Sequence, residues 1–188
     1  MKVIINIDGG SRGNPGIGAS AYVIKDTSGK ILAQEGHFIA HCTNNQAEYT
    51  ALRLALIKAA ELGAKELSII SDSLLLVKQY LGEYKIKNPD LAERMAEIRH
   101  LARPFQIQIQ HVLRHLNKEP DALANKAMDL KQSVGFNPIC HLPPAPQKEQ
   151  PANNNLLNGV PIEPVVRNKE GKTQKKKQIQ QPSLFDGF

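Results

Sequence analysis

Apolar residues in the first part of the chain follow the spacing of strands and then that of helices. Three short segments are rich in alternating or β-branched apolar residues, which predicts strands at 3–7 (VIINI), 19–26 (ASAYVIKD) and 31–40 (ILAQEGHFIA). Turn-forming residues cluster between the first two at 9–18 (GGSRGNPGIG), and 27–30 (TSGK) is typical of a hairpin. The three strands are therefore expected to pair antiparallel in chain order.

Helical periodicity begins just before residue 45. The predicted elements are then helix 45–62, strand 66–71, helices 73–81 and 90–102, strand 105–113 and helix 120–130. Gly63 ends the first of these helices, and Pro120 opens the last. An antiparallel start followed by helix-linked strands predicts an α/β fold, with a mixed sheet and helices packed on it.

The pattern changes after residue 130 of the 188-residue chain. Eight of the 12 prolines lie in this second part, and apolar periodicity disappears. Such a segment cannot bury enough apolar surface to offset its ordering entropy. We therefore predict a folded domain over 1–130, a disordered, basic, Pro/Asn/Gln-rich linker over 131–180, and an apolar peptide over 181–188.

Charge is distributed unevenly along the chain. The formal net charge is +6, but residues 1–130 hold 16 Lys and Arg against 14 Asp and Glu, whereas the remainder holds 8 against 4. A basic chain indicates a polyanionic partner. Because most of the excess lies in the tail, the partner of the domain has to be inferred from its motifs.

Cysteine content and hydropathy exclude several classes. The two cysteines, Cys42 and Cys140, exclude a disulfide scaffold and a four-cysteine zinc site. Each lies beside a histidine, so a Cys/His metal pair is an alternative to the favoured interpretation of reduced bystander thiols. The chain has no apolar run of about 18 residues and no secretory signal pattern, which predicts a cytoplasmic protein.

Four acids occupy positions where a carboxylate is costly. Asp8 and Asp72 each follow an apolar strand, and parallel strands would bring them out at the same sheet edge. Glu48 begins the core-facing stripe of its helix, and Asp121 lies in the first turn of the last helix. Singly, each is explained by a turn or a helix dipole. Together they indicate a site for hard cations such as Mg²⁺ or Mn²⁺, which keep clustered carboxylates ionised.

Four segments carry a family resemblance: IDGGSRGNPGIGA, TNNQAEYTALRLAL, IISDSLLLV and RHLNKEPDALANKAM. Their order and spacing resemble the motifs of type 1 ribonuclease H across 1–130. The resemblance implies a five-stranded mixed sheet flanked by helices, and endonucleolytic cleavage of the RNA strand of RNA–DNA hybrids. It implies a monomer that binds two Mg²⁺ ions, with Mn²⁺ as a substitute, through Asp8, Glu48, Asp72 and Asp121. Two-metal hydrolysis would leave 5′-phosphate and 3′-hydroxyl ends.

The resemblance also implies substrate contacts. The RNA backbone and the hybrid's minor groove would be met by Gly9, Gly10, Ser11, Asn14, Thr43, Asn44, Asn45 and Gln46. Thr43 or Asn44 is also a candidate helix cap, and we expect both roles together. His115 stands where relatives carry a mobile histidine that assists proton movement or product release, although its spacing to Asp121 is shorter here. Longer members carry a basic helix and loop between Leu81 and Asp90 that is missing from this compact chain.

The end of the tail has its own resemblance. Gln181, Leu184 and Phe185 match the bacterial peptide that binds the sliding clamp, and a eukaryotic clamp box through Gln181, Leu184 and Phe188 fits less well. A chance match of five residues is the alternative. An apolar peptide at the end of a disordered basic tail is suited to tethering.

The function predicted from the sequence is therefore a Mg²⁺-dependent endoribonuclease. One alternative is a broader nuclease that also cuts double-stranded RNA. The other is a non-catalytic nucleic-acid or clamp adaptor on the same fold, which need not have kept the four acids.

Overall fold

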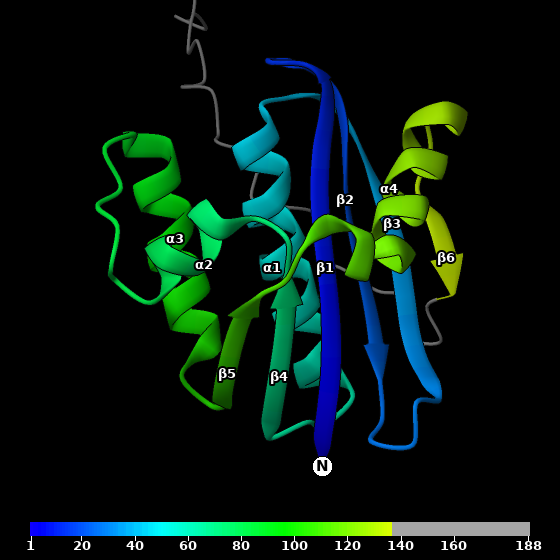
Figure 1. The fold of residues 1–188 in the computed structure, drawn as a ribbon, viewed down its shortest axis with the longest axis vertical. Coiled ribbons are helices and arrows are strands. Elements are labelled where there is room, and N and C mark those ends of the chain that lie inside the picture. The colour runs from blue at the N-terminus through cyan, green and yellow to red at the C-terminus, as the bar shows by residue number, and fades with distance from the viewer. Residues whose placement is uncertain (137–188) are drawn as a thin grey trace, which may run out of the picture. The chain divides into compact units, whose positions relative to one another are not determined.

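The computed structural model describes residues 1–136, which form a six-stranded mixed sheet in the order β5-β4-β1-β2-β3-β6 (Figure 1). The strands are β1 (Lys2–Gly13), β2 (Gly16–Lys25), β3 (Ile31–Cys42), β4 (Glu66–Ser71), β5 (Gln106–His111) and β6 (Val134–Phe136). The three longest strands pair antiparallel in chain order, β4 lies parallel to both β1 and β5, and β6 pairs antiparallel with β3.

The helices cover the two faces of the sheet. They are α1 (Asn44–Glu61), α2 (Leu74–Tyr80), α3 (Pro89–Ala102) and α4 (Lys118–Leu130), with a short 3₁₀ turn, η1 (Arg114–Leu116), before α4. Figure 1 shows α1 behind the sheet, with α2 and α3 to one side, and α4 in front of β2 and β3. Within residues 1–136, no helix is long and apolar enough to cross a membrane.

A core of different size fills each side of the sheet. The larger core joins the sheet to α1 and α3 through residues such as Ile5, Ile7, Leu52, Leu56 and Met95, which are at most 1% exposed. The smaller core under α4 is made mostly of alanines, namely Ala19, Ala21, Ala124 and Ala127, together with Met128. Because small residues face one another there, α4 lies close to β2 and β3, and it also contacts β1.

The glycine cluster at 9–18 was predicted to be a turn, and this prediction is wrong for most of its length. β1 continues through Gly13 and β2 starts at Gly16, so only two residues join the strands. The glycines serve close packing instead. A Cβ at Gly9 would lie 2.3 Å from the backbone nitrogen of Glu48, and one at Gly18 would lie 2.4 Å from Sγ of Cys42. The sequence signal for a turn therefore came from positions that need to be small.

The predicted α/β fold is confirmed, but the sheet has one strand more than expected. β6 lies beyond residue 130 and pairs Val134 with Gly36 and Phe136 with Gln34. A three-residue strand has too short a pattern to stand out in the sequence. The linker was predicted over 131–180, and its first residues hold β6 (Val134–Phe136). The rest of the linker from residue 137 onward, Cys140 and the peptide at 181–188 lie outside the described residues.

Candidate active site

Two acids are brought together by the register of parallel strands. Ile7 of β1 pairs with Ser71 of β4, and Asp8 and Asp72 are the next residue in each strand direction. The expectation that these two side chains emerge side by side is confirmed. β4 ends there, whereas β1 continues, so Asp8 lies within a strand and is only 7% exposed.

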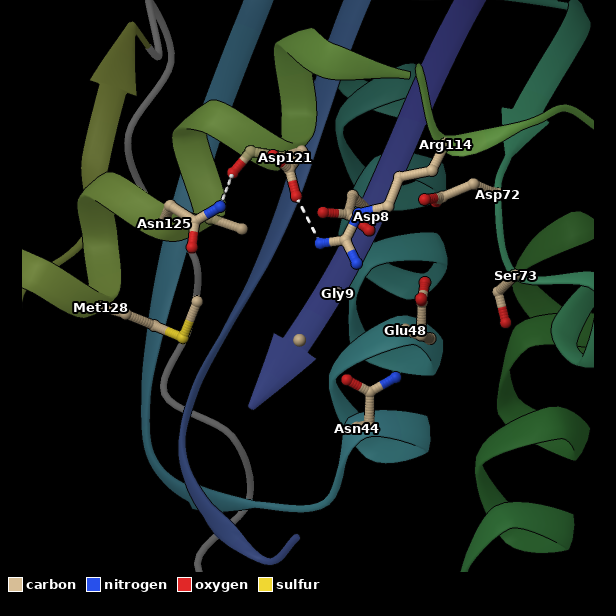
Figure 2. A pocket seen from close by; sticks show the side chains of 12 residues that line it. Asp8, Gly9, Asn44, Glu48, Asp72, Ser73, Arg114, Asp121, Asn125 and Met128 are labelled. Carbon is tan, nitrogen blue, oxygen red and sulfur yellow. Dashed lines mark hydrogen bonds and ion pairs between the residues drawn. The ribbon is translucent and has the colours of Figure 1, made fainter. Parts of the chain in front are cut away.

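Glu48 joins them from the first turns of α1. The helix approaches β1 closely because Gly9 has no side chain, which places Glu48 next to Asp8. One carboxylate oxygen from each of Asp8, Glu48 and Asp72 lies within 4.8 Å of the others, and Figure 2 shows the three side chains converging. Three separate elements thus contribute one carboxylate each to a single point.

The cluster is electrostatically unfavourable as it stands. Burial, together with the charges of Asp72 and Asp121, raises the pKa of Asp8 to about 7. Burial and the neighbouring charges of Asp8 and Asp72 also raise the pKa of Glu48 well above its usual value. Oε2 of Glu48 is buried without a hydrogen-bond partner among residues 1–136.

These observations fit a hard divalent cation. An unpartnered, buried carboxylate oxygen is expensive unless a cation or a donor approaches it. Convergent oxygen ligands without sulfur or nitrogen are the donor set that Mg²⁺ and Mn²⁺ prefer. Asp8, Glu48 and Asp72 are therefore the residues able to hold such an ion.

Asp121 lies to one side of this cluster. It occupies the first turn of α4, and Nη2 of Arg114 donates to its Oδ1 at 2.8 Å. Both residues line a cavity of about 300 Å³ with the other three acids. In Figure 2 the guanidinium group points between Asp8 and Asp121. The sequence analysis did not single out Arg114, although a basic residue shortly before the fourth acid was visible.

His115 lies on a different side of the same turn. It lines a neighbouring cavity with Asn6, Leu116, Asn117, Lys118 and Glu119, and it is not among the residues around the acids. Its ring is exposed to solvent. A part in proton movement or product release stays a prediction.

The predicted substrate residues lie around the mouth of the acidic cavity and beside it. Gly9, Gly10 and Asn44 line that cavity directly. Asn14 lies in the β1–β2 turn, where its Oδ1 accepts a hydrogen bond from the backbone nitrogen of Asn44 at 3.1 Å. The hydroxyl of Ser11 is buried without a partner among the described residues. Their contacts with a substrate stay predictions.

Thr43 and Gln46 stabilise the start of α1. Thr43 caps the helix, and the two residues form a reciprocal capping box, so the expected cap is confirmed. Nε2 of Gln46 also donates to Asp90 of α3 at 2.9 Å. Asn45 is half-buried in the same turn. To contact a minor groove, Gln46 would have to exchange bonds that it already makes.

Other residues of the cavity wall were missed by the sequence analysis. Ser73 caps α2 directly after Asp72, and Asn125 lies one turn beyond Asp121 on α4. Nδ2 of Asn125 donates to the backbone oxygen of Asp121 at 2.9 Å, as Figure 2 shows. Helical spacing from Asp121 was the one available signal for Asn125.

Comparisons with known proteins match the folded part of the chain. A family model described as reverse transcriptase-like matches residues 6–127. Ribonuclease HI of Halobacterium salinarum is 43% identical over 129 residues, which make up 68% of this chain and 65% of that protein. The bifunctional protein Rv2228c of Mycobacterium tuberculosis is 44% identical over 131 residues, which make up 69% of this chain and 36% of that protein. The chain thus spans less than two thirds of either relative.

Solved structures share the fold. The N-terminal RNase H domain of Rv2228c matches with a TM-score of 0.67 at 41% identity, covering 69% of this chain and all of that one. LC11-RNase H1, solved in complex with an RNA/DNA hybrid, matches with a TM-score of 0.66 at 37% identity, covering 69% of this chain and 98% of that one. The similarity therefore takes in the whole of each matched domain or nearly so.

Proposed function

The chain belongs to the type 1 ribonuclease H family, and from this membership we propose that it cleaves the RNA strand of RNA–DNA hybrids endonucleolytically. The observation that carries the proposal is the convergence of Asp8, Glu48 and Asp72 within 4.8 Å, with Asp121 on the same cavity. A relative at 37% identity was solved with an RNA/DNA hybrid, which supports this substrate.

The four acids would hold the cations that the reaction needs. Two divalent ions held there, Mg²⁺ or in its place Mn²⁺, would supply Lewis acidity for activating water and stabilising the leaving 3′ oxygen, and the products would carry 5′-phosphate and 3′-hydroxyl ends. Asp8 would help to hold both ions, because it clusters with Glu48 and Asp72 and because the charge of Asp121 also raises its pKa. Asp121 would help to hold the second ion.

The rest of the cavity would bind and orient the hybrid. Gly10 and Asn44 leave room at its mouth for a sugar–phosphate backbone, since a Cβ at Gly10 would meet only Oδ1 of Asn44 at 3.7 Å. The amides at the start of α1 and in the β1–β2 turn would face a minor groove in which 2′-hydroxyls distinguish RNA from DNA. Arg114 would neutralise acid charge until cations and phosphate take its place.

A broader nuclease and a non-catalytic adaptor are the competing functions. Burying Asp8 and Glu48 together is unfavourable to the fold, as the raised pKa values show, and an adaptor has no use for that arrangement. This favours an enzyme. Whether double-stranded RNA is also cut is decided by comparing the cleavage of matched RNA–DNA and RNA–RNA duplexes.

Cleavage of matched substrates tests the function. The full chain is incubated with Mg²⁺ and one sequence prepared as RNA–DNA, RNA–RNA and DNA–DNA duplexes. We expect cuts in the RNA of the hybrid alone, loss of activity in EDTA, and recovery with Mg²⁺ or Mn²⁺. Equal cutting of double-stranded RNA would establish the broader nuclease, and no cutting of any duplex would favour the adaptor.

We also propose that the peptide at 181–188 binds a bacterial sliding clamp. The support is the sequence match of Gln181, Leu184 and Phe185, which lie outside the described residues. Titration of the synthetic peptide against purified clamp tests it, with a Leu184→Ala/Phe185→Ala peptide as control. Loss of binding in the control supports the proposal, because apolar anchors carry most of the affinity of such peptides. Equal or absent binding by both peptides would refute it without touching the nuclease.

A further inference from the structure

Asn117 occupies the first flanking position of α4 but does not cap that helix. Asparagine at this position normally accepts a hydrogen bond from a backbone N–H two or three residues later. Here the backbone angles are φ −119° and ψ 34°, and no side-chain capping bond forms. The side chain is turned into the protein instead, where the residue is 1% exposed. Its amide therefore serves something other than its own helix.

Three hydrogen bonds engage both the nitrogen and the oxygen of the amide group. Nδ2 donates both to the backbone oxygen of Ile7, at 2.8 Å, and to Oδ1 of Asp72, at 3.1 Å. Oδ1 accepts from Nδ2 of Asn6 at 3.1 Å. The two acceptors near Nδ2 settle the orientation of the amide, because a flipped group would face oxygen with oxygen.

These partners tie together the parts of the site that come from distant segments. Ile7 immediately precedes Asp8 in β1, Asp72 follows β4, and Asp121 lies four residues after Asn117 on α4. Asp8 and Asp72 are also related by strand pairing, but nothing in the sheet fixes the rotation of the Asp72 carboxylate. Asn117 donates to Oδ1 of Asp72, and one carboxylate oxygen of Asp72 lies within 4.8 Å of oxygens of Asp8 and Glu48.

We propose that Asn117 is a positioning residue: its amide sets the orientation of the Asp72 carboxylate and locks the start of α4 to the end of the β1–β4 pair. The proposal rests on the proposed function in assuming that Asp72 binds a cation. Hydrogen bonds that orient the ligands of a metal commonly change affinity or activity by about 10- to 100-fold when lost. Because only 1% of Asn117 is exposed, its replacement should act on metal binding and turnover and leave KM for the hybrid unchanged.

The first experiment measures Mn²⁺ affinity by calorimetry without nucleic acid, in a double-mutant cycle of Asn117→Ala and Asp72→Ala. If Asn117 acts through Asp72, its replacement weakens Mn²⁺ binding by about 10-fold in the wild-type background and less than about 2-fold once Asp72 is alanine. Equal weakening in both backgrounds, or none in either, would overturn the proposal. Because no substrate is present, this result stands even if the hybrid is not cleaved by the wild-type chain.

The second experiment separates positioning from general stability. Gln79→Ala is the matched control, because Gln79 is also a buried amide that bonds another side chain, Tyr49, and a backbone oxygen, but lies away from the acids. We expect both variants to melt at lower temperature than the wild type, and only Asn117→Ala to lose kcat, by about 10-fold or more at unchanged KM. An equal kcat loss in both variants would assign Asn117 a structural role.

A less disruptive substitution is used if the Asn117→Ala variant does not fold. Asn117→Ser keeps one hydrogen-bond donor and fills part of the same space, so it is the milder change. The same Mn²⁺ cycle is then run with this variant. A crystal structure of the folded variant would show whether the serine hydroxyl reaches Asp72. If it does not reach and the Mn²⁺ affinity is still that of wild type, the proposal is overturned. A weakened Mn²⁺ affinity supports it.

Discussion

Arg114 and Asp121 are seven residues apart in the chain and meet in a 2.8 Å ion pair at the mouth of a cavity that three other acids line. The contact with Asp121 raises the pKa of Arg114, and the positive charge of Arg114 partly offsets the rise that burial and neighbouring acids cause in the pKa values of Asp8 and Glu48. The Arg114 side chain is 77% exposed, so it can leave without disturbing the core. Among the residues of 1–136 that line this cavity, Arg114 is the only one with a positively charged side chain. It is therefore the cation nearest to the carboxylates there.

The Arg114→Ala variant should depend more on divalent cations for its stability. Removing the guanidinium leaves the acids less neutralised, so we expect a lower melting temperature in EDTA near neutral pH. Saturating Mg²⁺ should narrow the difference from wild type, because bound cations replace the missing charge. The measurement is a thermal melt of both proteins with and without Mg²⁺. Lys126→Ala, an exposed charge on α4 away from the cavity wall, is the control. An identical melting temperature for Arg114→Ala and wild type in EDTA would contradict this role.

The Asp8→Asn variant should lose hybrid cleavage while keeping the fold. The substitution preserves the shape of the side chain but removes the charge at the centre of the cluster, where both cations are proposed to bind. We expect kcat/KM to fall by at least about 1,000-fold, which corresponds to roughly 4 kcal/mol of transition-state stabilisation. Initial rates on the RNA–DNA duplex in saturating Mg²⁺ provide the measurement. Turnover within an order of magnitude of wild type would remove Asp8 from the site.

The same variant should be more stable than wild type without metal, and the gain should depend on pH. The pKa of Asp8 rises from 3.8 to about 7 on folding, so the folded protein binds this proton more tightly than the unfolded chain. The stability associated with that proton is present at low pH and is lost as pH increases through about 7. Asparagine cannot ionise, so it avoids the loss.

Melting curves in EDTA across this range check the effect. We expect Asp8→Asn to melt above wild type at about pH 8, and the difference to shrink towards about pH 4. A difference that grows as the pH falls would show that the carboxyl is stabilised in its charged form. Asp26→Asn is the control, because hydrogen bonding from Ser28 lowers the pKa of this exposed acid and predicts the opposite trend.

The sequence was informative where chemistry follows simple periodicity. Asp8 and Asp72 each directly follow a run of apolar strand residues, so they were expected together if the two strands were parallel neighbours, and the pairing of Ile7 with Ser71 meets that condition. Glu48 could be assigned to a core-facing stripe for the same reason. What these acids bind still has to be measured.

Other features depend on contacts between distant segments and have no local signal. Gly9 reads as a turn residue, but it is small because the backbone of Glu48 lies 2.3 Å from where its Cβ would be. Asn117 was not singled out in the sequence, because its amide bonds Ile7 and Asp72 across more than 40 positions of sequence. Only tertiary packing decides between such alternatives.

The end of the folded domain can be tested by truncation, because β6 lies beyond the boundary at residue 130 that the sequence suggests. Val134 packs with Phe38 and Leu123 against the small core under α4, and the hydroxyl of Ser133 accepts a hydrogen bond from the backbone nitrogen of Phe38 at 3.1 Å. A protein ending at residue 130 loses both contacts and exposes the edge of β3. A protein ending at residue 136 keeps them. All four acids are present in both, so the two should differ in stability more than in chemistry.

We expect the shorter protein to melt a few degrees lower, since removing one partly buried valine costs on the order of 1 kcal/mol, and a domain of this size shifts by about 4 °C per kcal/mol. Val134→Ala in the longer protein separates apolar packing from strand pairing, because it keeps the backbone bonds of β6. The melting temperature of the Val134→Ala variant should lie between those of the shorter and the longer protein. Once both proteins are saturated with Mg²⁺ below their melting temperatures, kcat on the hybrid should agree within about 2-fold, because none of residues 131–136 lines the acidic cavity. Equal melting temperatures would show that β6 adds nothing to the fold, and a large loss of kcat in the shorter protein would show that the position of α4, and with it Asp121, depends on this last strand.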